Sequence, residues 1–329
     1  MKRLITLLFL IALFVVPQPV RAAMVITNQV GTIERDTILD VPCRVYLPYQ
    51  YVERVQLDKR VVFPVLYLHH GMFGSEDDWT EQGNILKWMS TLLLANQIKE
   101  MIVIMPDNFL GSMPLSERKA LMAAPNVTPS GDQFEIDEGA AHWRKLSRER
   151  EQGYEMSGYW EEHFREFMSE VEKRYRVSNN PAQRAIAGLS MGGFHTMHVS
   201  HYLHGMFAYV GLFSPVIIPR RSADGAEQME TDEETQFHTM GFDLQLDYGS
   251  PAYNNWMADM RRMTAAPPMY WMAIGRDDFL YAQLQDYRMW LDLNNFEYTY
   301  YESKGGHTWS NWQDYLCRFM KKLFWDEKF

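Results

Sequence analysis

The sequence is poor in cysteine and has no excess of basic residues. Only Cys43 and Cys317 occur among 329 residues, and no Cys-x-x-Cys spacing is present, which excludes cysteine-based metal and redox motifs. A disulfide between the two stays open, since it requires Cα atoms within roughly 7 Å. The formal net charge of −10 excludes nucleic acid as a partner, because phosphate binding needs a concentrated basic surface. A small or neutral substrate fits this charge better.

The sequence also lacks an apolar run long enough to span a bilayer comfortably. Two basic residues precede an apolar run at 4–16, which two prolines and a small-residue exit then close. We expect residues 1–22 to be a bacterial signal peptide cleaved after about Ala22, with an uncleaved anchor as the alternative. The mature chain, residues 23–329, is then expected to be soluble, free of the membrane, and periplasmic or secreted.

No internal repeat and no Pro/Gly/Ser-rich linker divides the chain, so one domain is expected over residues 23–329. Apolar, β-branched runs alternate with segments of helical spacing, which predicts an α/β fold with a largely parallel sheet covered on both faces. The expected strands cover residues 26–33, 43–47, 61–68, 101–105, 185–189, 208–213, 269–274 and 296–301, and the clearest helices 85–98, 159–175, 191–203 and 309–324.

Two polar, Gly- and Pro-containing stretches, residues 108–158 and 215–249, are longer than ordinary α/β connections. In this architecture ligands bind beyond the carboxyl ends of the strands, so these loops are candidates for a pocket rim or lid. The alternative is surface loops that do not contact substrate.

The segment Gly188-Leu189-Ser190-Met191-Gly192-Gly193 lies between an expected strand and an expected helix. This is the context of a nucleophile elbow, in which the serine occupies a sharp turn and the glycines allow close strand–helix approach. Ser190 needs a base, because a hydroxyl is a poor nucleophile until a histidine takes its proton. His307, which follows an expected strand and the pair Gly305-Gly306, is the candidate base.

An acid that orients the histidine should follow a strand between the serine and the histidine in the chain. The turn Gly275-Arg276-Asp277-Asp278-Phe279 offers two carboxylates, and the residues alone do not separate Asp277 from Asp278.

Two backbone N–H groups are also needed to stabilise a developing oxyanion. We expect Met191, after the nucleophile, to supply one, and Met72, after the third strand, to supply the other, with Phe73 as the fallback.

Four motifs together resemble the putative-esterase family, which holds feruloyl and acetyl-xylan esterases of carbohydrate esterase family one, the esterase D group and mycolyltransferases. The resemblance runs from about Arg44 to the end of the chain. In that family the acid is the fourth residue of the Gly-x-x-Asp turn, so the resemblance implies Asp278; a departure is Phe73 in a usually glycine-rich loop. The motifs are His70 to Trp79, Gly188 to Gly193, Gly275 to Phe279 and Gly305 to His307.

The resemblance and the expected export imply an α/β-hydrolase that acts through an acyl-enzyme on a small-molecule or polysaccharide-linked ester, without metal or organic cofactor. A feruloyl, related hydroxycinnamoyl or acetyl ester on plant cell-wall polysaccharide is the expected substrate. A periplasmic siderophore-lactone esterase and an acyltransferase are alternatives with the same triad. A non-catalytic binding protein on a hydrolase fold is the alternative from another class.

Other conspicuous side chains have simpler interpretations. His195, His198, His201 and His204 recur every three residues on an expected helix, but a step of three turns each side chain by about 60°, so the four fan out and do not converge on a metal. Trp79 and Trp309 flank the candidate site in sequence. They either line an aromatic-acyl pocket or brace the loops.

Overall fold

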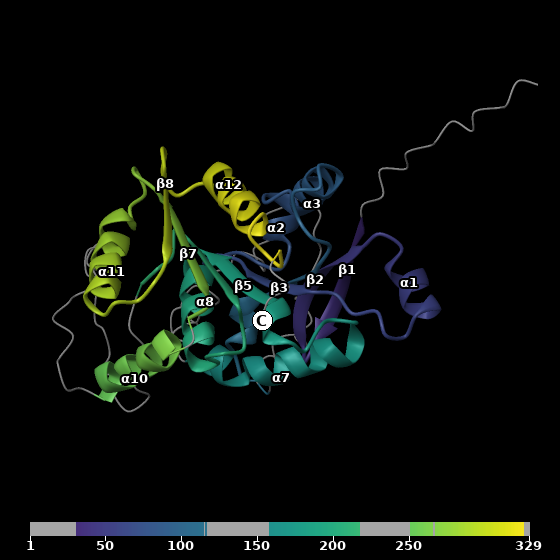
Figure 1. Ribbon diagram of the computed structural model, residues 1–329, viewed down its shortest axis with the longest axis horizontal. Coiled ribbons are helices and arrows are strands. Elements are labelled where there is room, and N and C mark those ends of the chain that lie inside the picture. The colour runs from purple at the N-terminus through teal and green to yellow at the C-terminus, as the bar shows by residue number, and fades with distance from the viewer. Residues whose placement is uncertain (1–30, 115, 117–157, 218–250, 266, 326–329) are drawn as a thin grey trace, which may run out of the picture.

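One sheet lies at the centre of the molecule (Figure 1). The computed structural model describes residues 31–114, 116, 158–217, 251–265 and 267–325. Within them, eight strands form one sheet in the order β1-β2-β4-β3-β5-β6-β7-β8. The strands are β1 (Gly31–Ile38), β2 (Val41–Pro48), β3 (Val65–His69), β4 (Ile102–Pro106), β5 (Arg184–Leu189), β6 (Tyr209–Phe213), β7 (Met269–Gly275) and β8 (Thr299–Ser303).

Strand direction follows the expected α/β pattern. β1 pairs antiparallel with β2, and β2 antiparallel with β4, whereas all pairs from β4 to β8 are parallel. Parallel strands covered on both faces are apolar throughout, and every residue of β3, β4, β5 and β6 is buried. The predicted fold class, a mostly parallel sheet flanked by helices, is confirmed. The carboxyl ends of β3 to β8 therefore share one edge of the sheet.

Helices cover both faces of the sheet, and each face buries its own apolar cluster. Side chains from α7, α8, α10 and α11 fill one cluster, and those from α2, α3 and α12 fill the other (Figure 1). In the described ranges no helix has the length and apolarity to cross a membrane. The helices are α1 (Tyr51–Leu57), α2 (Asp78–Glu81), α3 (Ile85–Leu94), α4 (Asn108–Gly111), α7 (Tyr159–Arg174), η1 (Pro181–Gln183), α8 (Met191–Tyr202), α10 (Pro251–Ala265), α11 (Tyr281–Leu293) and α12 (Trp309–Met320).

Two strands begin later than their apolar patterns predicted. The strand expected over 61–68 begins at Val65, because Pro64 has no N–H to donate to a ladder. The strand expected over 296–301 begins three residues later, at Thr299. The apolar Phe296 lies in the connection after α11 and not in a strand. It is buried there, with its ring edge-on to Tyr270 at 5.1 Å.

The two cysteines do not form a disulfide. Cys43 belongs to the cluster on one face of the sheet, whereas Cys317 packs against the cluster on the other face, so the sheet separates them. Burial raises the pKa of both thiols, that of Cys317 to about 12. Neither thiol is therefore ionised at neutral pH, which makes both poor nucleophiles.

Several expected segments lie outside the described residues. They include the expected signal peptide at 1–22 and the beginning of the strand expected from residue 26. Residues 117–157 of the first long loop and residues 218–249 of the second also lie outside. Their predicted role as a rim or lid stays a prediction.

Candidate active site

Ser190 occupies the sharp turn between β5 and α8, with φ 52° and ψ −119°. A residue with a Cβ rarely adopts a positive φ, and such strain, of order 1–3 kcal/mol, persists only where the surroundings enforce it. Here the Ser190 N–H donates to Phe213 O at 2.9 Å, and Ser190 O accepts from Gly193 N at 2.9 Å and Val216 N at 3.1 Å. These bonds anchor the turn at the carboxyl edge of the sheet.

Two glycines of the elbow are required by close packing. A Cβ on Gly188 would lie 2.3 Å from Gly192 O, and a Cβ on Gly192 would lie 2.2 Å from His70 O. Both distances are shorter than the non-bonded carbon–oxygen distances found in proteins. The first glycine thus lets the helix approach the strand, and the second lets the loop after β3 approach the helix.

His307 lies between Ser190 and Asp278, within hydrogen-bond distance of both. Its Nε2 is 2.9 Å from Ser190 Oγ, and its Nδ1 is 3.0 and 2.9 Å from the two carboxylate oxygens of Asp278. A carboxylate only accepts, so Nδ1 carries the proton and Nε2 keeps a lone pair for the Ser190 hydroxyl. Asp278 is 4% exposed, and the Leu280 N–H holds it through a 2.9 Å bond to Oδ1.

The neighbouring carboxylate, Asp277, has different surroundings. Its side chain is exposed, and its Oδ2 accepts from the Gly305 N–H at 3.2 Å. Its own N–H donates to Gly305 O at 3.0 Å. Asp277 therefore ties the β7 turn to the loop that carries His307, and only Asp278 contacts the imidazole.

Met191 and Met72 are the two predicted oxyanion donors. Met191 is the first residue of α8, and Met72 follows Gly71, on which a Cβ would come within 3.4 Å of the Ser190 Cβ. In the part of the chain that the structure describes, neither the Met72 nor the Met191 N–H has a hydrogen-bond acceptor. Phe73 adopts φ 62°, which ends the loop in a turn that glycine usually makes.

Aromatic rings surround His307 in a way that the sequence did not predict. Phe279 is 62% exposed, and its ring centroid lies 4.5 Å from that of His307. Trp312 contacts the same imidazole edge-on at 4.8 Å and is buried. The sequence feature that could have identified Phe279 is its position directly after the acid. An aromatic ring thus lies directly beside the candidate base.

Trp79 and Trp309 had two interpretations, and for Trp79 the structure favours the bracing one. Trp79 is 1% exposed, and its Nε1–H donates to His69 O at 2.9 Å, so it cannot line an open pocket. The Trp309 ring lies edge-on to that of Trp79 at 5.2 Å and to that of Trp312 at the same distance. The three indoles thus connect α2 to the beginning of α12.

The four histidines on and just after α8 differ in burial and in position. His195, His198 and His201 are buried, whereas His204 is exposed in the turn after the helix ends. His195 Nδ1 is 3.5 Å from the buried Glu161 on α7. Among the described residues, no group of three or more His, Cys, Asp or Glu side chains is placed to hold a metal ion.

Glu76 lies in an acidic segment next to the candidate oxyanion loop. Partial burial, followed by repulsion from Asp107 and Asp77, raises the pKa of Glu76 to about 7. In the unfolded chain a glutamate titrates near its ordinary value of about 4.3. Between these two values the folded chain holds a proton that the unfolded chain has lost, so this group destabilises the fold as pH rises.

Glu76→Gln is therefore expected to unfold at higher denaturant than the native chain at pH 8 but not at pH 4.5. Because Glu76 is partly solvated, we expect a difference of about 1 kcal/mol, which grows between about pH 4.3 and 7 and is complete above pH 7. Urea unfolding at a series of pH values measures it. Glu81→Gln on α2 makes the same charge change at an exposed site. Equal pH slopes for the two variants would contradict the prediction.

Comparisons with known proteins found one family and several relatives that the chain resembles. A model of the family described as putative esterase matches residues 38–109 and 110–323. A protein of Xylanibacter ruminicola named endo-1,4-beta-xylanase/feruloyl esterase is 28% identical over 173 residues, which is 52% of this chain and 19% of that protein. An acetyl esterase of Caldicellulosiruptor saccharolyticus is 28% identical over 165 residues, 48% of this chain and 62% of the relative. The chain thus spans less than two thirds of either relative's length.

A solved structure supports the fold over most of the chain. The CE1 ferulic acid esterase of the anaerobic fungus Anaeromyces mucronatus has a TM-score of 0.56 at 20% identity, with 89% of this chain and 90% of that chain covered. At this identity the likeness shows the fold alone.

Proposed function

The chain belongs to the putative-esterase family, and from this membership we propose that it is a serine carboxylic-ester hydrolase. The observation that carries the proposal is the continuous chain of contacts from Asp278 through His307 to Ser190. Ser190 is the proposed nucleophile, His307 the general base and Asp278 the residue that orients the imidazole. The residues occur in the chain order Ser, Asp, His that is typical of α/β-hydrolases.

The proposed reaction has two steps. Ser190 Oγ attacks the ester carbonyl and its proton passes to His307 Nε2, while the new oxyanion accepts from the Met72 and Met191 N–H groups. The C–O bond to the alcohol then breaks, the alcohol takes the proton from Nε2, and an acyl-enzyme remains. Water repeats the sequence and releases the acid. Buried Asp278 stabilises the imidazolium that forms in each step.

For the substrate, we propose a feruloyl, related hydroxycinnamoyl or acetyl ester on plant cell-wall polysaccharide. The names of the two relatives, one a feruloyl esterase and one an acetyl esterase, support this range. The Phe279 ring, whose centroid lies 4.5 Å from that of His307, supports an aromatic or sugar group close to the base. We also propose export by a signal peptide at 1–22, on the sequence pattern alone, which the mass of the exported chain tests.

A rate comparison on three esters tests this proposal: methyl ferulate, p-nitrophenyl acetate and a triscatecholate lactone. We expect kcat/KM of about 10⁴ M⁻¹s⁻¹ or more for ferulate or acetate, as is usual for enzymes, and little lactone hydrolysis. Selective lactone hydrolysis would move the assignment to a siderophore esterase. Transfer of the acyl group to an added sugar in place of water would indicate an acyltransferase. Turnover of none of the three would contradict the hydrolase assignment.

A further inference from the structure

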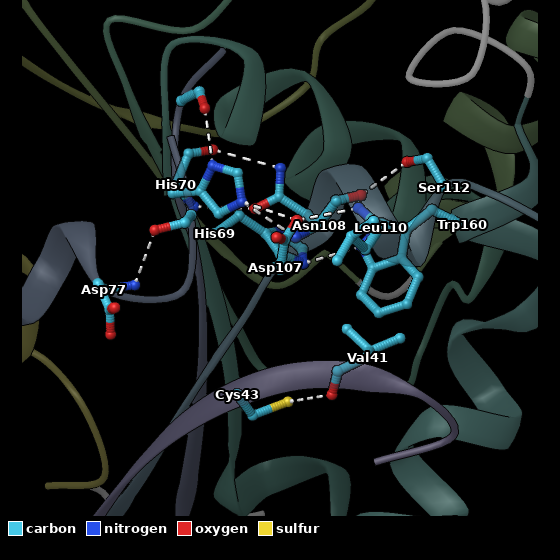
Figure 2. Close-up of polar contacts among 12 residues, drawn as sticks. Val41, Cys43, His69, His70, Asp77, Asp107, Asn108, Leu110, Ser112 and Trp160 are labelled. Atoms are coloured by element: carbon cyan, nitrogen blue, oxygen red, sulfur yellow. Dashed lines mark hydrogen bonds and ion pairs between the residues drawn. The ribbon is translucent and has the colours of Figure 1, made fainter. Parts of the chain in front are cut away.

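His70, the residue before the candidate oxyanion loop, uses all of its polar atoms in a buried network (Figure 2). Its main-chain N–H donates to Asn108 Oδ1 at 3.0 Å, and its main-chain oxygen accepts from Asn108 Nδ2 at 3.3 Å. Its ring Nδ1 is 2.7 Å from Gly71 O, and its Nε2 is 3.1 Å from the Asn108 main-chain nitrogen. One residue just after β4, Asn108, thus holds the His70 backbone through its side chain and the His70 ring through its main-chain N–H.

Asn108 is itself fixed. Asp107 caps α4 by accepting from the Leu110 N–H at 2.9 Å, and the Ser112 hydroxyl donates to Asn108 O at 2.8 Å. Asn108 is fully buried. Nothing in the sequence pattern singled out Asp107 and Asn108, although a polar pair at the carboxyl end of a central strand is the signal that could have done so.

The contact from the His70 ring to Gly71 O fixes the orientation of one peptide group. That carbonyl also accepts from the Gly74 N–H at 3.2 Å, so it is held from two sides. The described residues contain no cis peptide, and in a trans peptide the C=O of one residue points opposite to the N–H of the next. Holding Gly71 O therefore determines where the Met72 N–H points.

We propose that His70 is a positioning residue for the oxyanion hole: its Nδ1–H binds Gly71 O and thereby aims the Met72 N–H at the reacting carbonyl oxygen. This inference rests on the proposed esterase function, since only an acyl-transfer reaction needs that donor. Asp107 and Asn108 hold His70 from the neighbouring strand. Through these two residues, the contacts that support the oxyanion loop reach the end of β4, two strands from the strand that precedes Ser190.

The proposed bond is present in either charge state of the ring. Burial disfavours the imidazolium, but the hydrogen bond and charge of Asp107, with the charge of Asp78, raise the pKa of His70 to about 9. In the neutral ring Nε2 accepts from the Asn108 N–H at 3.1 Å, and in the charged ring Nε2–H faces Asp107 Oδ1 at 3.5 Å. A carbonyl only accepts, so Nδ1 carries a proton toward Gly71 O in both states.

Two substitutions of His70 separate the two ring contacts. In His70→Asn the side-chain amide nitrogen occupies the place of Nδ1, so the donor to Gly71 O is kept and the Nε2 contact is lost. In His70→Gln the amide reaches the place of Nε2, so the Asn108 contact is kept and the donor to Gly71 O is lost. Both variants replace the ring by an amide at a buried site, which makes each the control for the other.

The experiment measures kcat, KM and the inhibition constant of a boronic acid that mimics the tetrahedral intermediate, alongside thermal unfolding. Loss of one oxyanion donor typically costs about 10²- to 10³-fold in kcat, so His70→Gln is expected to lose about 10²-fold in kcat with a similar KM. Its boronate affinity should fall in parallel. His70→Asn should stay within about tenfold of the native chain in both, because its amide still aims the same peptide.

Each outcome has a distinct meaning. Equal losses of kcat in the two variants, in proportion to their losses of melting temperature, would show that His70 only supports the fold and would overturn the inference. Ester hydrolysis by the native chain would in that case leave the esterase proposal standing. A larger loss in His70→Asn would also overturn it. If the native chain hydrolyses no ester, the proposed function fails, and the inference fails with it.

Discussion

Ser190→Ala is expected to lower kcat for ester hydrolysis by about 10⁶-fold, the size of effect found when a serine hydrolase loses its nucleophile. The substitution removes one oxygen, the atom 2.9 Å from His307 Nε2. Alanine keeps the Cβ, so the strained turn at φ 52° and its backbone hydrogen bonds persist. The base, the acid and the two main-chain donors stay in place, and the loss therefore measures the nucleophile alone.

Ser214→Ala is the matched control for this variant. Ser214 follows β6, the strand next to β5, and also has a positive φ of 44°. Its hydroxyl is buried and has no hydrogen-bond partner among the described residues. We expect this variant to keep kcat within a few-fold of the native value. Intact mass after brief exposure to p-nitrophenyl acetate should show an acyl adduct in the native chain and in Ser214→Ala, but not in Ser190→Ala.

Residual turnover in Ser190→Ala well above the expected level, with the adduct still formed, would show that another group is the nucleophile. Neither cysteine is a natural substitute, because burial raises the pKa of both thiols.

The parts of the site that could be predicted from the sequence are those that need a special backbone. Ser190 directly follows the buried strand β5, and His307 follows β8 after a turn that contains Gly305 and Gly306. In both places the glycines needed for the turn can be recognised in the sequence. The parallel sheet was predictable for a similar reason, since strands buried on both faces must be apolar throughout. These signals are local, so one sequence is enough to find them.

The contacts that depend on strand order could not be predicted in this way. His70 and Asn108 are 38 residues apart and meet because β3 lies between β4 and β5 in the sheet. No local pattern encodes that order. Likewise, Asp277 and Asp278 follow the same strand, and only the path of the chain after Gly275 buries one carboxylate under His307 and leaves the other exposed.

Asp278→Asn is expected to lower kcat by about 10⁴-fold with little change in KM. The buried carboxylate accepts from Nδ1–H, which leaves the Nε2 lone pair facing Ser190. An asparagine amide can donate to Nδ1 and stabilise the other tautomer, in which Nε2 carries the proton and cannot take one from the hydroxyl. The imidazolium formed during the reaction also loses its buried negative partner.

Asp277→Asn makes the same chemical change one residue away, at an exposed side chain whose one hydrogen bond among the described residues comes from the Gly305 N–H. We expect this control to keep kcat within a few-fold of the native chain. Thermal unfolding of both variants separates loss of fold from loss of orientation, because Asp278 also binds the Leu280 N–H. If Asp277→Asn proved to be the inactive variant, the exposed carboxylate would have to reach His307 only when substrate is bound, and the Asp278 contact would be structural.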